Sequence, residues 1–190
     1  MNMVKNSLTN VELTIVFRAL KFSAYKHRKQ RRKGSAGIPY INHPIEVTSM
    51  IIELLENPKY DLLAAALLHD TIEDTNTSAE EIEHAFGNRI MRLVMEVTDD
   101  KRISRVKRKQ LQIDKARELT YEAKCIKIAD KACNISDILY TRIKWSRQRK
   151  INYVKWANEV IGQIRDTNAE LVGAFDKEVT KAQELLDFKL

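Results

Sequence analysis

The sequence predicts an all-α protein, and three observations lead to this class. Residues that favour helices dominate the composition, above all Ala, Leu, Ile, Glu, Lys and Arg, while the 190 residues include only 5 Gly and 3 Pro. Apolar residues recur at helical spacing along almost the whole chain. No internal repeat or low-complexity linker divides it. We therefore expect one compact domain over residues 1–190, built of about eight to ten helices.

The first expected helix carries a regular apolar stripe and begins at Asn10, which can cap it. It ends within the basic stretch 26–33. Gly34 and Pro39 then indicate a loop. His43 would lie at the start of the next helix, because the Pro that follows it favours a first helical turn.

Caps and turn residues delimit the later helices. The segment after Asp61 is so apolar that we expect it to be buried. Ser78 and Glu81 form a capping-box pattern that opens a short helix ending at Gly87. Segment 101–117 is densely basic but keeps an apolar stripe, which favours an exposed helix over a disordered tail. The helices expected after the first span residues 45–55, 61–74, 78–87, 88–98, 101–117, 121–140, 148–166 and 169–186.

Composition also bears on compartment and partners. Cys125 and Cys133 form neither a CxxC pair nor a disulfide framework, so we expect free thiols in a reducing compartment. The longest apolar run, 62–68, is far too short to span a bilayer, and we expect a soluble, cytoplasmic protein without membrane contact. The net charge of +7 is compatible with a phosphate-bearing partner, although a merely solvated surface explains it equally well.

The most informative polar residues, His69 and Asp70, directly follow this apolar run. Burying two metal-competent groups costs free energy unless something compensates, and a divalent cation is a usual compensation. Alone, the pair is better explained as a hydrogen-bonded structural pair. Glu73 and Asp74 change the balance, because carboxylates one helical turn away repel Asp70 unless a cation or proton lies among them. The alternative for these two acids is a solvated helix end.

Three further polar residues are candidates for the same site or for ordinary structural roles. Asp130 interrupts an apolar stripe and is a candidate ligand, but it could equally form a salt bridge with Lys127 or Lys131. His43 is a second candidate, with a polar helix-entry residue as the alternative. For His27, which lies in a basic segment, we expect a solvated ring.

In this order and on separate helices, His43, His69-Asp70 and Asp130 resemble the metal-ligand signature of the HD phosphohydrolase superfamily. The longer motifs around them resemble the hydrolase domain of the bifunctional Rel/Spo alarmone enzymes, and most closely its stand-alone form, the small alarmone hydrolases. The resemblance covers about residues 16–160. Its motifs are HRKQRRK (27–33), PYINHP (39–44), AALLHDTIEDT (65–75), VTDDK (97–101) and IKIADK (126–131), followed by Asn134.

The resemblance implies a role for each group. The family's metal, usually manganese, would be held by His43, His69, Asp70 and Asp130. Glu73 and Asp74 match the catalytic acidic pair that orients and activates the attacking water. The implied substrate contacts are Arg32 and Lys33 for base and phosphates, Asn134, and Arg149 with Tyr153 in the last substrate-facing segment.

The implied reaction is manganese-dependent hydrolysis of guanosine 3′,5′-bispyrophosphates at the 3′ position, which releases pyrophosphate and GDP or GTP. Such chemistry needs a divalent ion, a carboxylate that accepts a proton, and Arg or Lys to neutralise the phosphates. The chain is too short for the synthetase domain of the long family members, so we expect a hydrolase alone.

Two alternatives stay open. One is phosphatase action on another phosphorylated nucleotide such as NADPH. The other is a non-catalytic nucleotide or RNA binder, suggested by the basic segment 101–117. Glu73 and Asp74 argue against a pure binder, because carboxylates beside Asp70 would repel phosphate.

Overall fold

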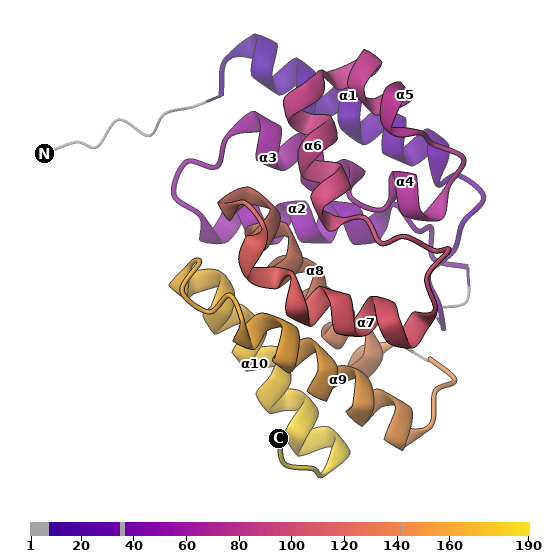
Figure 1. Cartoon of the computed structure of the whole chain (residues 1–190), viewed down its shortest axis with the longest axis vertical. Coiled ribbons are helices and arrows are strands. Elements are labelled where there is room, and N and C mark those ends of the chain that lie inside the picture. Colours follow the sequence, from indigo (N-terminus) through magenta and orange to yellow (C-terminus); the bar gives the residue numbers. More distant parts are fainter. Residues whose placement is uncertain (1–7, 35–36, 142) are drawn as a thin grey trace, which may run out of the picture.

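The computed structural model describes residues 8–34, 37–141 and 143–190. Within these ranges the protein consists of helices joined by short connections, without a β-strand, and the all-α class is confirmed (Figure 1). Residues 1–7 of the expected domain lie outside the described residues. The elements are α1 (Asn10–Lys26), α2 (Asn42–Leu54), α3 (Tyr60–Leu68), α4 (Thr71–Asp74), α5 (Ala79–Phe86), α6 (Asn88–Val97), α7 (Arg105–Asp114), the 3₁₀ helix Ala116–Glu118, α8 (Tyr121–Tyr140), α9 (Arg147–Gly162) and α10 (Ala169–Leu186).

Helices α3 and α8 form the interior of the molecule. Every α3 residue after Tyr60 is buried, and α3 packs against α1, α2 and α6. Helix α8 packs against α2, α6, α9 and α10, and it buries Ile126, Ile128 and Ile135 completely. Because α2 contacts both interior helices, it links the two halves of the core.

The expected helix over 61–74 is interrupted at His69 and Asp70, which separate α3 from α4. The carbonyls of Ala66 and Leu68 would accept backbone N–H groups if the helix continued. Instead, the ring Nδ1 of His69 bonds to the Ala66 carbonyl at 2.7 Å, and the Thr71 hydroxyl donates to the Leu68 carbonyl at 2.6 Å. Side-chain hydrogen bonds thus compete with the helix and form a corner that carries two polar residues, His69 and Asp70.

The capping of two helices differs from expectation. Helix α1 is capped by Thr9 rather than by Asn10, because Thr9 and Glu12 form a complete capping box. Ser78 caps α5 as predicted, but the Glu81 carboxylate pairs with Lys26 at 2.7 Å instead of closing the box. The segment expected as one helix over 101–117 contains the shorter α7 and a 3₁₀ turn.

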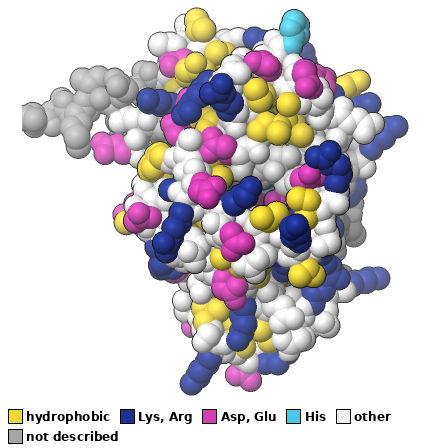
Figure 2. All heavy atoms as spheres, in the orientation of Figure 1, with side chains coloured by type: hydrophobic (Ala, Val, Ile, Leu, Met, Phe, Trp, Pro, Cys, Tyr) yellow, Lys and Arg dark blue, Asp and Glu magenta, His cyan; other side chains and the backbone are white. Residues whose placement is uncertain are grey.

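The surface mixes both signs of charge. Figure 2 shows basic and acidic side chains interspersed on one face, with hydrophobic side chains scattered between them. Among the described residues, none of the helices combines the length and hydropathy that a membrane span requires.

Candidate metal centre and nucleotide pocket

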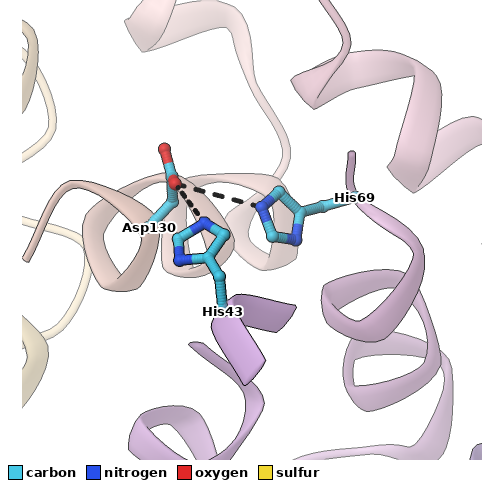
Figure 3. A group of neighbouring side chains, drawn as sticks. All are labelled: His43, His69 and Asp130. Atoms are coloured by element: carbon cyan, nitrogen blue, oxygen red, sulfur yellow. Dashed lines mark hydrogen bonds and ion pairs between the residues drawn. The ribbon is translucent and has the colours of Figure 1, made fainter. Parts of the chain in front are cut away.

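The four predicted ligands lie together, although they come from three parts of the fold. His43 lies in the first turn of α2, His69 and Asp70 at the corner after α3, and Asp130 in the middle of α8. Ligand atoms of His43, His69 and Asp130 all lie within 4.8 Å of one another (Figure 3). Asp70 completes the group, since its Oδ2 lies 3.0 Å from His69 Nε2 and 3.8 Å from His43 Nε2.

The hydrogen bonding of His69 fits this residue to a cation. Its Nδ1 faces the Ala66 carbonyl, which makes Nδ1 the protonated nitrogen and leaves a lone pair on Nε2. That Nε2 is buried, makes no hydrogen bond within the described residues, and faces Asp70 and Asp130. A lone pair and two carboxylates repel one another unless a proton or metal ion lies between them. The donor set therefore fits a divalent metal ion.

The two carboxylates of the group, Asp70 and Asp130, are each held in place by neighbouring side chains. Lys131 Nζ donates to Asp130 Oδ2 at 2.8 Å, while Oδ1 lies 3.1 Å from His43 Nε2. Burial opposes ionisation, but Lys131 and His43 hold the pKa of Asp130 well below its usual range. The Tyr40 hydroxyl donates to Asp70 Oδ2 at 2.5 Å, and burial together with this carboxylate raises the pKa of Tyr40. Tyr40 is therefore a fixed hydrogen-bond donor.

The histidines have opposite electrostatic surroundings. Burial disfavours a charged ring at His69, but Asp70 and Asp130 outweigh it and raise the pKa of His69 to about 9. At His43 burial dominates and lowers the pKa. Both rings belong to one cluster, so a proton and a metal ion compete for the space between their Nε2 atoms and the carboxylates.

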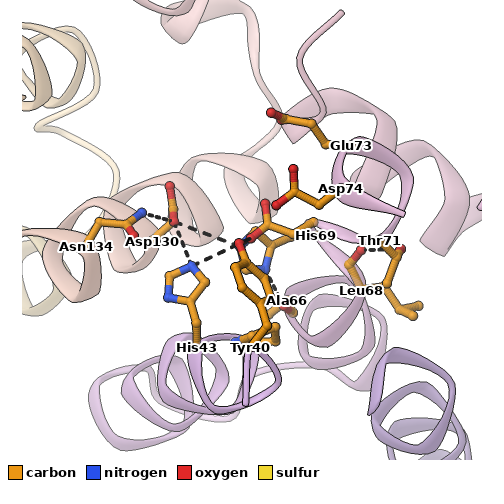
Figure 4. Close-up of polar contacts among 12 residues, drawn as sticks. Tyr40, His43, Ala66, Leu68, His69, Thr71, Glu73, Asp74, Asp130 and Asn134 are labelled. Atoms are coloured by element: carbon orange, nitrogen blue, oxygen red, sulfur yellow. Dashed lines mark hydrogen bonds and ion pairs between the residues drawn. The ribbon is translucent and has the colours of Figure 1, made fainter. Parts of the chain in front are cut away.

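The acidic pair Glu73 and Asp74 lies on α4, next to the metal-ligand group, and lines the same cavity as His69 and Asp130 (Figure 4). Each carboxylate has its own support. Asp74 accepts hydrogen bonds from Gln30 at 2.9 Å and from Lys101 at 2.5 Å. Burial and neighbouring carboxylates raise the pKa of Glu73, although the Asp99 N–H opposes this. A raised pKa suits a group that must accept a proton near neutral pH.

A cavity of about 320 Å³ joins this acidic corner to basic and aromatic side chains. Arg32 Nε donates to Asp137 at 2.7 Å, and its Nη2 donates to Asn134 at 3.0 Å. Asn134 in turn donates to Asp130 Oδ1 at 2.5 Å, so one chain of hydrogen bonds connects the predicted substrate contacts with a predicted metal ligand. Lys33 also lines the cavity.

The last two predicted contacts, Tyr153 and Arg149, differ in their relation to this cavity. Tyr153 lines it, together with Trp145. Arg149 does not; it lines an adjoining cavity that shares Trp145 and Tyr153, and its guanidinium lies 4.2 Å from the Trp145 ring centre. The structure thus brings the acidic pair, Arg32, Lys33, Asn134 and Tyr153 into one cavity, with Arg149 beside it.

The expectation for His27 is wrong. Its ring is 1% exposed, stacks on Tyr40 with 4.8 Å between the ring centres, and pairs with Gln30 through Nδ1 at 2.6 Å. Burial lowers the pKa of His27. The reason is its position directly after α1, where it caps the C-terminal end of the helix one turn after the buried Ser23 and on the same side. The helical spacing from Ser23 therefore predicts the burial of His27 better than the basic residues around it do.

Sequence reasoning also missed residues that support the site. Tyr40 stands three positions before His43 in a recognised motif, but nothing local shows that its hydroxyl reaches Asp70. Asp137 could have been suspected, because it follows Asn134 by one helical turn. It binds Arg32, 105 positions away in the chain.

Comparisons with known proteins show which family this chain resembles. The family model described as HD domain matches residues 19–155. The guanosine-3′,5′-bis(diphosphate) 3′-pyrophosphohydrolase MESH1 of Xenopus tropicalis is 43% identical over 166 residues, which make up 87% of this chain and 93% of the relative. The human protein of the same name is 43% identical over 161 residues, 84% of this chain and 90% of its own.

A solved structure extends the likeness to three dimensions. It is described as a metazoan ortholog of SpoT that hydrolyzes ppGpp and plays a role in starvation responses. It matches with a TM-score of 0.86 and 37% identity, over 92% of this chain and 97% of that one. With a matching domain model over most of its length and relatives this similar, the chain belongs to the HD domain family.

Proposed function

We propose that this protein is a manganese-dependent hydrolase that removes the 3′-pyrophosphate of (p)ppGpp and releases pyrophosphate with GDP or GTP. The observation behind the proposal is one cavity lined by metal-ligand candidates, by an acidic pair, and by basic and aromatic side chains. Relatives above 40% identity over most of the chain carry the name of this activity.

The proposed metal ligands are His43, His69, Asp70 and Asp130. When bound, the ion would supply Lewis-acid activation of water and of a phosphoryl oxygen. Manganese is the family's usual metal, and the mixed imidazole and carboxylate ligands are compatible with it. The remaining chemistry belongs to side chains of this chain.

In the proposed reaction, water oxygen bonds to the phosphorus attached to the 3′-oxygen, and the bond between that phosphorus and the 3′-oxygen breaks. Glu73 accepts the proton that water loses, and Asp74, held by Gln30 and Lys101, orients the water. The 3′-oxygen leaves as a hydroxyl, because Glu73 returns the accepted proton to it through solvent water and regains its charge. Arg32 and Lys33 line the cavity and supply positive charges that offset part of the phosphate charge.

The other contacts would orient the nucleoside. Asn134 offers a side chain that already bonds to Asp130, so it can link the substrate position to the metal ligands. Tyr153 offers an aromatic surface, and Arg149 offers a cation at the edge of the cavity. We further propose that residues 1–190 form a single cytoplasmic domain, which the buried free thiols of Cys125 and Cys133 favour.

The test is an assay of the purified protein with Mn²⁺ against ppGpp, pppGpp, NADPH and GMP, with products identified by chromatography and mass spectrometry. We expect pyrophosphate and GDP from ppGpp. Glu73→Gln and Asp74→Asn should lose turnover by about 100-fold or more while keeping the circular dichroism spectrum of the wild type. Hydrolysis of NADPH but not of ppGpp would instead support the alternative function, a phosphatase that acts on another phosphorylated nucleotide.

Two results would contradict any such hydrolase. Turnover of GMP alone would mean that the cavity does not select a nucleotide with a phosphorylated 3′ or 2′ position. Binding to nucleic acid with a steep salt dependence, without hydrolysis of any nucleotide, would indicate the non-catalytic binder.

A further inference from the structure

The Glu73 carboxylate is held at both of its oxygens by residues outside α4. Its Oε2 accepts the backbone N–H of Asp99 at 3.1 Å. Its Oε1 lies 3.6 Å from Arg108 Nη1 on α7. The same guanidinium nitrogen lies 3.8 Å from Asp99 Oδ2, to which Gln112 donates at 2.7 Å. These residues form a closed set around the carboxylate and fix its plane.

Helix α7 is built to hold this set in place. Arg108 and Gln112 are four residues apart, so both side chains leave the same face of the helix. Ser104 caps the first turn through the Lys107 N–H. Helix α7 packs on α9, where the Trp156 indole donates to the Lys109 carbonyl at 3.0 Å. The position of Arg108 is therefore fixed by a capped and packed helix rather than by a loose surface side chain.

Glu73 is surrounded by charges on each neighbouring segment. The groups that act on it are Asp70 just before α4, Asp74 at the end of α4, Asp99 before α7, Arg108 on α7 and Lys127 on α8. Three of these are carboxylates that oppose a second negative charge. Only about one fifth of the Arg108 side chain is exposed, so its ion pair with Glu73 is screened less than a surface pair. Its Nε is buried without a hydrogen-bond partner among the described residues.

We infer that Arg108 is a positioning residue for the proposed reaction, which fixes the orientation of the Glu73 carboxylate through Glu73 itself and through Asp99. The inference rests on the proposed function. Loss of the guanidinium would leave Glu73 with one backbone hydrogen bond, three repelling carboxylates and only Lys127 as a nearby cation among the groups named above. The Glu73 carboxylate would then turn away from the attacking water more often. Its pKa would also rise, so it would be protonated up to a higher pH.

The test compares Arg108→Gln with Lys107→Gln, measuring kcat and KM for ppGpp from pH 5 to 9 at saturating Mn²⁺. Lys107 is exposed on the same helix and loses the same charge, which makes it a matched control. For Arg108→Gln we expect kcat to fall about 10- to 100-fold with KM nearly unchanged. The acid limb of its kcat profile should move to higher pH. Arg108→Lys should recover part of kcat, and Lys107→Gln should behave as wild type.

The outcomes separate this inference from the proposed function. A wild type that hydrolyses no phosphorylated nucleotide overturns the function and the inference together. An active wild type with an unchanged kcat in Arg108→Gln overturns the inference alone. A raised KM at unchanged kcat also overturns it, because that pattern belongs to a substrate contact. If Arg108→Gln does not fold, Gln112→Met removes only the bond to Asp99 and should lower kcat without raising KM.

Discussion

Lys127 places an ammonium group almost completely inside the protein, on α8 beside the cavity. Burial, reinforced by Lys131 and only partly offset by nearby carboxylates, lowers the pKa of Lys127 from 10.5 to about 8. Below pH 8 both folded and unfolded chains carry this charge, and the folded state bears its full desolvation cost. Between pH 8 and 10.5 only the unfolded chain binds the proton, so this contribution to the free energy of unfolding rises with pH.

Replacing Lys127 by Met should therefore stabilise the protein at pH 7, by on the order of 3 kcal/mol. The advantage over the wild type should shrink as the pH approaches 10, because the wild-type lysine is then neutral in the folded state. Urea unfolding of both proteins at pH 7 and at pH 9.5 measures this difference. An advantage that is the same at both pH values would show that desolvation of Lys127 is not its source.

At the residue scale, the sequence indicated those polar side chains that interrupt an apolar pattern. His69, Asp70 and Asp130 stand out in this way, and the family motifs added His43. The supporting residues could not be found in this way, because their partners are distant in the sequence. Arg108, for example, lies 35 positions after Glu73. Long side chains with charged ends look the same in a sequence whether they are solvated or reach into a site.

At the scale of elements, helix positions were predicted well where caps and turns are local. Tyr121–Tyr140 and Ala169–Leu186 agree with the expected bounds. The break after Leu68 was missed, because periodicity continues through it and only side-chain bonds of His69 and Thr71 reveal it. Its consequence is functional, since the corner turns His69 and Asp70 toward α2 and α8.

At Gly34, the segment that carries Arg32 lies in close contact with the backbone at Ile143, and both Arg32 and Ile143 line the cavity. Gly34 has a φ of 89°, and a Cβ on it would lie 2.4 Å from the Ile143 Cα. Gly34→Ala must therefore push the segment that carries Arg32 away from the segment that leads into α9. We expect kcat/KM for ppGpp to fall at least about tenfold, because small misplacements of binding groups are costly.

Gly37→Ala is the control for this prediction. Gly37 also has a positive φ, of 80°, but a Cβ there would meet nothing within 4 Å. It therefore carries the backbone strain without the displacement, and kcat/KM should stay near the wild-type value. Equal losses in both variants would attribute the effect to strain in the loop and not to the contact with Ile143.

For the whole molecule, one buried apolar cluster draws on most of the long helices, including α1, α3, α8 and α10. This supports the proposal of a single domain, and domains of this kind usually unfold in one cooperative transition. Overall class and the number of helices followed from composition and periodicity. The packing partners of α3 and α8 could not be predicted from the sequence, because many helix arrangements bury the same apolar stripes.

A bound metal ion should stabilise this whole unit, because its proposed ligands come from the start of α2, the corner after α3 and the middle of α8. Unfolding separates these ligands, so the ion binds the folded state alone. At about 100 times its dissociation constant it adds about 2.7 kcal/mol, or about 5–10 °C in Tm for a chain of this length. Calorimetry with Mn²⁺ and with EDTA measures the shift.

Asp130→Asn provides the matched control, since it keeps the shape of the side chain while removing the charge that the ion needs. Its Tm should be nearly the same with Mn²⁺ and with EDTA. A shift as large as that of the wild type would place the stabilising ion elsewhere on the protein. A metal-dependent shift confined to the wild type would show that the ion ties α2, α3 and α8 together, so that one site both holds the reacting centre and strengthens the core around it.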